Sequence, residues 1–213
     1  MYVIIFILNF VGEHMKIIIF DFDDTLYNGT VWGNWQNYMK EFFAKTFNKQ
    51  EGTEFIEKYK LREHNFKISE TAKALIQEFG SAEKIVNYTI KNIYPLQAPD
   101  LHFIDINFLK KLSKKYPLYI VSNSSENRCL KYLKDNNIDT NIFRGIFTNK
   151  FESTDPTKAF CYKHIIEKEG VQPADIMVIG DNYNTDIMPA EQVGCKPVLV
   201  KTLEDIYNIN FDI

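Results

Sequence analysis

The chain has 213 residues, of which 45% are hydrophobic and 25% charged, and its formal net charge is −3 at pH 7. This length and composition predict one globular α/β domain with a small insertion. Because the net charge is slightly negative and no basic cluster stands out, a nucleic-acid-binding protein is disfavoured. The three cysteines form no CxxC pair, which argues against structural zinc and favours a reduced, cytoplasmic protein.

Residues 1–14 form an apolar extension ahead of the first predicted strand. The apolar run within it is too short to span a bilayer, and it lacks the basic start and cleavage site of a signal peptide. We therefore expect no membrane span. Met15 lies directly before the first strand and is an alternative start of the chain. If the extension is native, we expect it to cover a surface or an oligomer interface.

Two carboxylates follow the first predicted strand. Residues 16–20 are apolar and β-branched, as in a buried parallel strand, and Asp21 and Asp23 come directly after them. Ligands bind at the carboxyl ends of strands in open α/β sheets, and carboxylates buried there cost stability unless a cation or a reaction uses them. The pair could supply a nucleophile and a proton shuttle with a hard cation between them. Taken alone, such acids also cap helices and begin turns.

Residues 28–94 have a helical pattern. Large apolar residues recur at spacings of three and four from Trp32 to Phe43, and further helices are expected around 55–59 and after Ser69 and Ser81. No strand pattern is present, so we expect an inserted all-helical domain, with Pro95 and Pro99 in the returning linker. Candidate substrate contacts, each of which also fits a packing or surface role, are Tyr27, Trp32, Arg62, His64 and Lys67.

Strands and helices alternate from about residue 105 onward. The expected strands are 118–121, 145–148, 176–179 and 197–200, and the expected helices lie around 108–112, 127–134, 157–168, 185–192 and 203–207. This alternation predicts a parallel sheet with right-handed crossovers.

Two of these later strands also end in polar residues. Ser122 and Asn123 follow one strand, Asp181 follows another and precedes Asp186, and Lys158 lies early in a helix between them. Singly, the serine is a helix cap, the lysine a solvated side chain and Asp186 an acid in a first helical turn.

In this order, the residues resemble the four motifs of the haloacid dehalogenase-like hydrolases. These motifs are D-x-D-x-T, a hydroxyl residue after a strand, a lysine, and G-D-x-x-x-x-D, and the resemblance spans residues 16 to about 200. One departure is Ala159, because the family's lysine is often followed by proline. Lys150 and Lys163 are less suitable candidates, since neither follows a turn.

The resemblance implies a Rossmann-like parallel sheet core, 15–27 and 95–213, with an inserted all-helical cap of the C1 type at 28–94. It implies a Mg²⁺-dependent phosphatase that forms an aspartyl-phosphate. By resemblance, the catalytic residues are Asp21, Asp23 and Lys158; the phosphate ligands Ser122, Asn123 and Lys158; the metal ligands Asp21, Asp181 and the backbone carbonyl of Asp23; and the supporting residues Thr25 and Asp186.

Two alternatives remain open at this point: a sugar phosphomutase of the same family, and a non-catalytic binding protein that keeps the fold. The intact set of acids argues against the second. Asp23 also favours a phosphatase over a dehalogenase, since the dehalogenase branch lacks this residue. The expected partner is a small phosphorylated metabolite, with neither nucleic acid nor membrane; the sequence does not identify this metabolite or the oligomeric state.

Overall fold

The computed structural model describes residues 15–28, 102–124, 126–148 and 158–211. The N-terminal extension and nearly all of the expected cap lie outside the described residues, as do the candidate contacts Trp32, Arg62, His64 and Lys67. The predictions for these segments therefore remain predictions.

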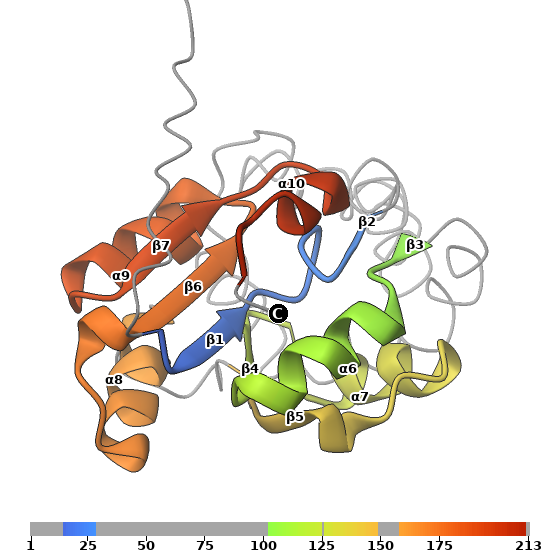
Figure 1. The fold of residues 1–213 in the computed structure, drawn as a ribbon, viewed down its shortest axis with the longest axis horizontal. Helices are drawn as coiled ribbons and strands as arrows, with labels where there is room; N and C mark the ends of the chain where they lie inside the picture. The colour runs from blue at the N-terminus through green and yellow to red at the C-terminus, as the bar shows by residue number, and fades with distance from the viewer. Residues whose placement is uncertain (1–14, 29–101, 125, 149–157, 212–213) are drawn as a thin grey trace, which may run out of the picture.

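A five-stranded parallel sheet forms the centre of the described chain (Figure 1). Its order is β5-β4-β1-β6-β7, so that β1, the strand that precedes Asp21, is central. Ile19 of β1 lies opposite Tyr119 of β4 on one side and Val178 of β6 on the other. The strands are β1 (Ile17–Phe20), β4 (Leu118–Ser122), β5 (Phe143–Thr148), β6 (Ile176–Gly180) and β7 (Lys196–Leu199).

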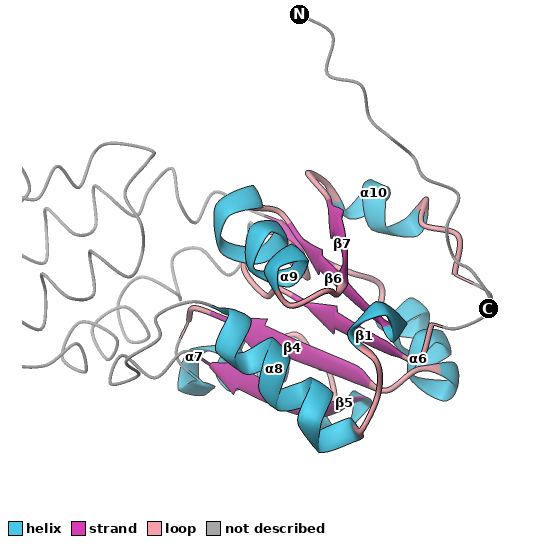
Figure 2. Cartoon of the chain, turned by 90° about the vertical axis from the view of Figure 1, so that its left-hand side faces the viewer, coloured by secondary structure: helices cyan, strands magenta, loops and turns pink. Residues whose placement is uncertain are grey.

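Helices cover both faces of this sheet (Figure 2). One face packs against α6 (Ile106–Lys115), α7 (Glu126–Asp135) and α10 (Leu203–Tyr207). The other packs against α8 (Lys158–Glu169) and α9 (Met188–Gln192). Successive residues of β1, β4 and β6 contribute to opposite cores, which explains why these strands lack polar residues ahead of Ser122, the last residue of β4. The predicted α/β parallel architecture is confirmed for this part of the chain.

Short elements complete the fold. Two 3₁₀ turns, η3 (Thr140–Ile142) and η4 (Pro173–Asp175), lead into β5 and β6. Helix α10 begins with a capping box, in which Thr202 accepts the backbone N–H of Asp205 and the Asp205 carboxylate accepts that of Thr202. Among the described helices, none combines the length and hydrophobicity that a membrane span requires.

A two-stranded antiparallel ribbon pairs β2 (Tyr27–Asn28) with β3 (His102–Phe103). The sequence did not predict this ribbon: Asn28 was expected to begin the cap, and no strand was expected between Pro99 and residue 105. Each strand has two residues, too few for an alternating pattern to be recognised. The ribbon joins the two points at which the chain leaves and re-enters the core.

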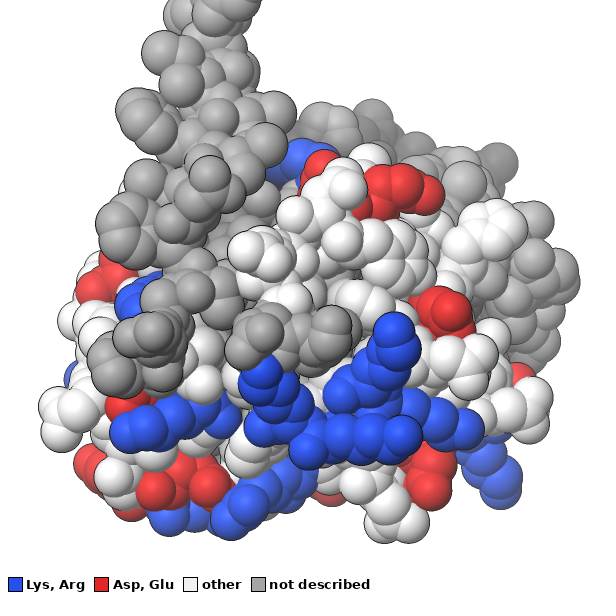
Figure 3. Space-filling model, in the orientation of Figure 1, with Lys and Arg blue, Asp and Glu red and all other residues white. Residues whose placement is uncertain are grey.

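Lysines gather on the solvent side of α6. Figure 3 shows basic side chains across the part of this face that α6 occupies, and Lys110, Lys111, Lys114 and Lys115 are all exposed. Two of them lie in the last helical turn, where they complement the helix dipole. The net charge of the whole chain does not reveal this local excess.

Candidate active site

Three neighbouring strands deliver polar residues to one edge of the sheet. Asp21 follows β1, Ser122 is the last residue of β4, and Asp181 follows β6. Because β4, β1 and β6 are adjacent and parallel, these ends meet at the same edge. Asp21 and Asp181, which the family resemblance gave as metal ligands, thus follow adjacent strands.

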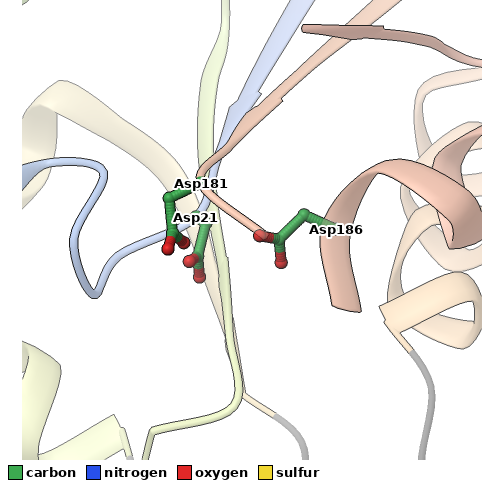
Figure 4. Close-up of side chains that lie close together, drawn as sticks. All are labelled: Asp21, Asp181 and Asp186. Carbon is green, nitrogen blue, oxygen red and sulfur yellow. The ribbon is translucent and has the colours of Figure 1, made fainter. Parts of the chain in front are cut away.

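Three carboxylates form a cluster at this edge. One carboxylate oxygen from each of Asp21, Asp181 and Asp186 lies within 4.8 Å of the others. Asp21 and Asp186 are buried, whereas Asp181 is half-buried. Figure 4 shows Asp21 and Asp181 close together and Asp186 pointing toward them from the following helical segment. Asp186, expected as a supporting residue, therefore joins the two expected metal ligands.

The Lys158 ammonium lies between two of these carboxylates. It is the first residue of α8 and is buried, with Nζ 2.5 Å from Asp21 Oδ1 and 2.6 Å from Asp186 Oδ1. Burial lowers the pKa of Lys158, but Asp21 and Asp186 more than compensate and hold it well above its usual value. Lys158 is thus a fixed positive charge in the site and not a solvated helix lysine.

Asp186 is held by the loop that follows β6. Its Oδ2 accepts the backbone N–H of Asn182 at 2.9 Å, while the N–H groups of Asp186 and Ile187 both point to the Asn182 carbonyl. This forms a π-helical turn, η5 (Tyr183–Ile187), ahead of α9, where the sequence predicted an α-helix from 185 to 192. Such π turns are often found at functional sites.

Gly180 permits this approach. A Cβ at this position would lie 2.5 Å from Cβ of Asp186 and 2.7 Å from its Cγ and Oδ2. Any side chain larger than hydrogen would therefore push Asp186 away from the sheet edge. The glycine of the G-D pair is required by space, and not by backbone conformation.

Asp23 lies in a separate polar environment. Arg128 on α7 places its Nη2 2.7 Å from Asp23 Oδ1, and both side chains are only 13% exposed. The hydroxyls of Tyr27 and Ser124 donate to the same carboxylate, and Ser122 Oγ lies 3.5 Å from Oδ2. The carboxylate of Asp23 is not part of the Asp21–Asp181–Asp186 cluster.

Arg128 and Ser124 were not predicted from the sequence, whereas Tyr27 was considered both for substrate contact and for packing. Tyr27 was a candidate substrate contact, but it is fully buried, and its ring packs against Phe22 and Phe103. The available signal was spacing: Tyr27 is four residues after Asp23, and Arg128 is four residues after Ser124.

Ser122 and Thr25, the two hydroxyl residues of the expected site, are also buried. Ser122 Oγ accepts the backbone N–H of Ser124 at 2.9 Å, which fixes the turn that follows β4. Asn123, between them, is half-buried at the sheet edge. Thr25 is buried in the loop after β1, and its hydroxyl has no hydrogen-bond partner among the described residues.

Comparison with known proteins agrees with this geometry. The sequence model of the haloacid dehalogenase-like hydrolases matches residues 15–194, which is most of the chain. The chain belongs to this family. None of the curated proteins searched matches it.

Solved structures of other family members share the fold of this haloacid dehalogenase-like hydrolase. A HAD phosphatase from Thermococcus onnurineus has a TM-score of 0.66 and 20% identity, with coverage of 92% of this chain and 97% of that chain. A haloacid dehalogenase-like family hydrolase from Streptococcus pneumoniae has a TM-score of 0.61 and 22% identity, covering 93% and 92%. An enzyme of the family from Bacteroides thetaiotaomicron, in complex with magnesium and inorganic phosphate, has a TM-score of 0.50 and 16% identity, covering 88% and 95%.

The carboxylate cluster of this hydrolase suits a hard divalent cation. Burial and the nearby Asp186 raise the pKa of Asp21 well above its usual value, although Lys158 opposes them. The pKa of Asp181 is raised for the same two reasons. Carboxylates that resist ionisation in the protein alone are stabilised in the charged form by a bound cation, and oxygen ligands suit Mg²⁺. The donor set of Asp21, Asp181 and Asp186 therefore fits a divalent cation such as Mg²⁺.

Proposed function

We propose that this hydrolase is a Mg²⁺-dependent phosphomonoesterase that works through an aspartyl-phosphate on Asp21. The observation that carries the proposal is that the carboxylates of Asp21 and Asp23, two positions apart in the sequence, lie in different surroundings. Asp21 lies among Lys158, Asp181 and Asp186, whereas Asp23 is held by Arg128 and hydroxyl groups. Two carboxyl groups in such different environments suit two different roles in one reaction.

Asp21 is the proposed nucleophile. One of its carboxylate oxygens forms a bond to phosphorus as the bond from phosphorus to the leaving oxygen breaks, which gives an aspartyl-phosphate. Asp23 donates a proton to the leaving oxygen in this step. In the second step Asp23 accepts a proton from water, the water oxygen bonds to phosphorus, and the Asp21 carboxylate is released.

The transferring phosphoryl group needs positive charge and hydrogen-bond donors. Lys158 supplies a buried ammonium next to Asp21, and Ser122 and Asn123 lie at the same sheet edge. A bound Mg²⁺ would offset the repulsion between a phosphate dianion and the anionic nucleophile. Asp186 holds Lys158 from the other side and so orients it toward the site.

The proposed substrate is a small phosphorylated metabolite. The family membership and the crystallised Bacteroides thetaiotaomicron relative with magnesium and inorganic phosphate support this class. The same core serves a phosphomutase, but no feature of the described residues favours transfer to a second substrate over transfer to water. Hydrolysis is therefore the function that we propose.

The first test is hydrolysis of p-nitrophenyl phosphate with and without Mg²⁺. We expect turnover only with the cation, and Asp21→Asn should abolish it while leaving the fold intact, because an amide cannot attack phosphorus. Asp24→Asn is the matched control: it makes the same change in the same loop, and Asn tolerates the positive φ of 55° found there. Turnover in Asp21→Asn equal to that of the control would rule out this nucleophile.

The second test separates the two steps. In Asp23→Asn the nucleophile remains, and a good leaving group needs no proton, so phosphorylation of Asp21 should proceed. Breakdown of the intermediate should slow by on the order of a hundredfold or more for want of a base. Mass spectrometry after mixing with p-nitrophenyl phosphate should detect the covalent adduct. Unchanged steady turnover without an adduct would remove Asp23 from its proposed role.

A further inference from the structure

Arg128 is a nearly buried cation with a fixed geometry beside Asp23. Its Nη2 lies 2.7 Å from Asp23 Oδ1 and 3.1 Å from the Tyr27 hydroxyl, and its Nη1 lies 2.6 Å from Ser124 Oγ. The guanidinium also lies over the ring of Tyr132, 5.0 Å from its centroid. Because the oxygen atoms hold the edge of the planar guanidinium and the ring of Tyr132 covers its face, the group has little freedom to rotate.

The groups around Asp23 restrain both oxygens of its carboxylate. Oδ1 is contacted by Arg128 and the Tyr27 hydroxyl, and Oδ2 accepts from Ser124. These residues come from α7, from β2 and from the turn after β4, so three segments of the chain meet on one side chain. Since Arg128 also contacts Tyr27 and Ser124, it connects these neighbours of Asp23 to one another.

Burial alone does not explain why an arginine occupies this place. Burial lowers the pKa of Arg128, yet the Asp23 charge more than offsets this, so that the guanidinium stays ionised. An arginine with only a packing role would leave a charge in a largely buried place for no gain. Here the guanidinium charge lies next to the carboxylate of Asp23, which is the group that transfers protons in both steps of the proposed mechanism.

We propose that Arg128 is a positioning residue that acts on catalysis through Asp23. Its guanidinium, together with the Tyr27 and Ser124 hydroxyls, holds the Asp23 carboxylate at the point from which it exchanges protons with the leaving oxygen and with water. The inference rests on the proposed function of Asp23. It adds a part of the active site that lies on α7, outside the motif residues.

The leaving group distinguishes this role from a purely structural one. A leaving oxygen of high basicity needs the proton from Asp23, whereas p-nitrophenolate leaves without it. If Arg128 acts through Asp23, its removal should lower kcat/KM for phenyl phosphate far more than kcat/KM for p-nitrophenyl phosphate. If Arg128 only stabilises α7, through its contact with the ring of Tyr132 on the same helix, its loss should affect both substrates equally.

The experiment compares Arg128→Met, Arg128→Lys and the control Lys131→Met in the full chain with Mg²⁺. Lys131 lies on the same helix in an exposed ion pair with Asp135, so its removal should change neither substrate. For Arg128→Met, we expect kcat/KM to fall about tenfold to a hundredfold with phenyl phosphate and less than about threefold with p-nitrophenyl phosphate. Arg128→Lys should recover part of the loss, because it restores the charge but not the planar fork.

A double-mutant cycle gives a second, independent readout. In the Asp23→Asn background, Arg128→Met should cause no further loss in kcat/KM for phenyl phosphate, since its target carboxylate is already gone. A structural role would produce the same loss in both backgrounds. If Arg128→Met does not fold, Tyr27→Phe replaces it in the cycle, because it removes one donor to Asp23 and keeps the ring.

Equal losses with the two phosphates, or additive losses in the Asp23→Asn background, would overturn the inference about Arg128 and leave the proposed function untouched. Full turnover of both substrates by Asp23→Asn would overturn the proposed function, and the role of Arg128 would fall with it. A selective loss with phenyl phosphate, absent in the Asp23→Asn background, supports both.

Discussion

Gly180→Ala tests the geometry of the site with a single methyl group. The new Cβ would lie 2.5 Å from Cβ of Asp186, whereas non-bonded carbon atoms prefer about 3.5–4.0 Å. Asp186 must therefore retreat by about 1 Å, and overpacking of this kind costs about 1–3 kcal/mol. In a protein of this size, each kcal/mol lowers Tm by roughly 2–4 °C.

The same substitution should reduce turnover more than its effect on stability suggests. Lys158 Nζ lies 2.6 Å from Asp186 Oδ1, so a displaced Asp186 moves the charge that we propose binds the phosphoryl group. A misplacement of about 1 Å can cost on the order of a hundredfold in rate. We expect a loss of this order in kcat/KM for p-nitrophenyl phosphate, measured with Mg²⁺ well below Tm.

Gly170→Ala is the control for this experiment. Gly170 has a φ of +63°, and no atom lies within 4 Å of the position that a Cβ would occupy, so alanine should cost about 1–2 kcal/mol through backbone strain alone. Its turnover should match that of the wild type. If Gly180→Ala keeps wild-type turnover despite a lower Tm, the position of Asp186 does not control Lys158, and the reasoning is refuted.

Three further predictions concern charge and stability. Lys158→Met leaves buried carboxylates of Asp21 and Asp186 unpaired, which should cost about 3–5 kcal/mol in urea unfolding near pH 8. Because burial and the Asp186 charge raise the pKa of Asp21, its carboxyl group binds protons more strongly in the folded state, so this deficit should shrink toward pH 5. A constant deficit would contradict the ion-pair account. Mg²⁺ should raise Tm of the wild type more at about pH 8 than at about pH 5. The reason is that burial raises the pKa values of Asp21 and Asp181, so protons compete with the cation for the same oxygens at the lower pH. Equal rises in Tm by calorimetry would argue against these ligands. Thr202→Ala removes the cap of α10 and should cost about 1 kcal/mol in thermal unfolding while turnover stays unchanged; an altered turnover would mean that α10 influences the site.

The three central strands of the sheet could be predicted because they are buried on both faces. The apolar runs at 16–20, 118–121 and 176–179 became β1, β4 and β6 with boundaries that differ by one residue. The end of such a run also locates the sheet edge, so strand ends placed Asp21 and Asp181 at the same edge. That they lie on adjacent strands was implied by the family resemblance, because local pattern does not specify the strand order.

The environment of Asp23 could not be predicted in the same way. Tyr27, Ser124 and Arg128 converge only because α7 packs beside the loop that follows β1, and no periodicity in the sequence specifies that distance. The π turn of η5 also escaped prediction, since apolar spacing does not distinguish it from the first turn of an α-helix. Both features depend on tertiary contacts of polar groups.

The charges at the sheet edge link the binding of cation and phosphate. When ionised, Asp21, Asp181 and Asp186 carry three negative charges, of which the Lys158 ammonium balances one. A phosphate dianion is therefore repelled until a divalent cation is present. By thermodynamic reciprocity, a bound phosphate must raise the affinity for the cation by the same factor by which the cation raises the affinity for phosphate. Product inhibition by inorganic phosphate should consequently strengthen as the Mg²⁺ concentration rises, until the cation site is saturated.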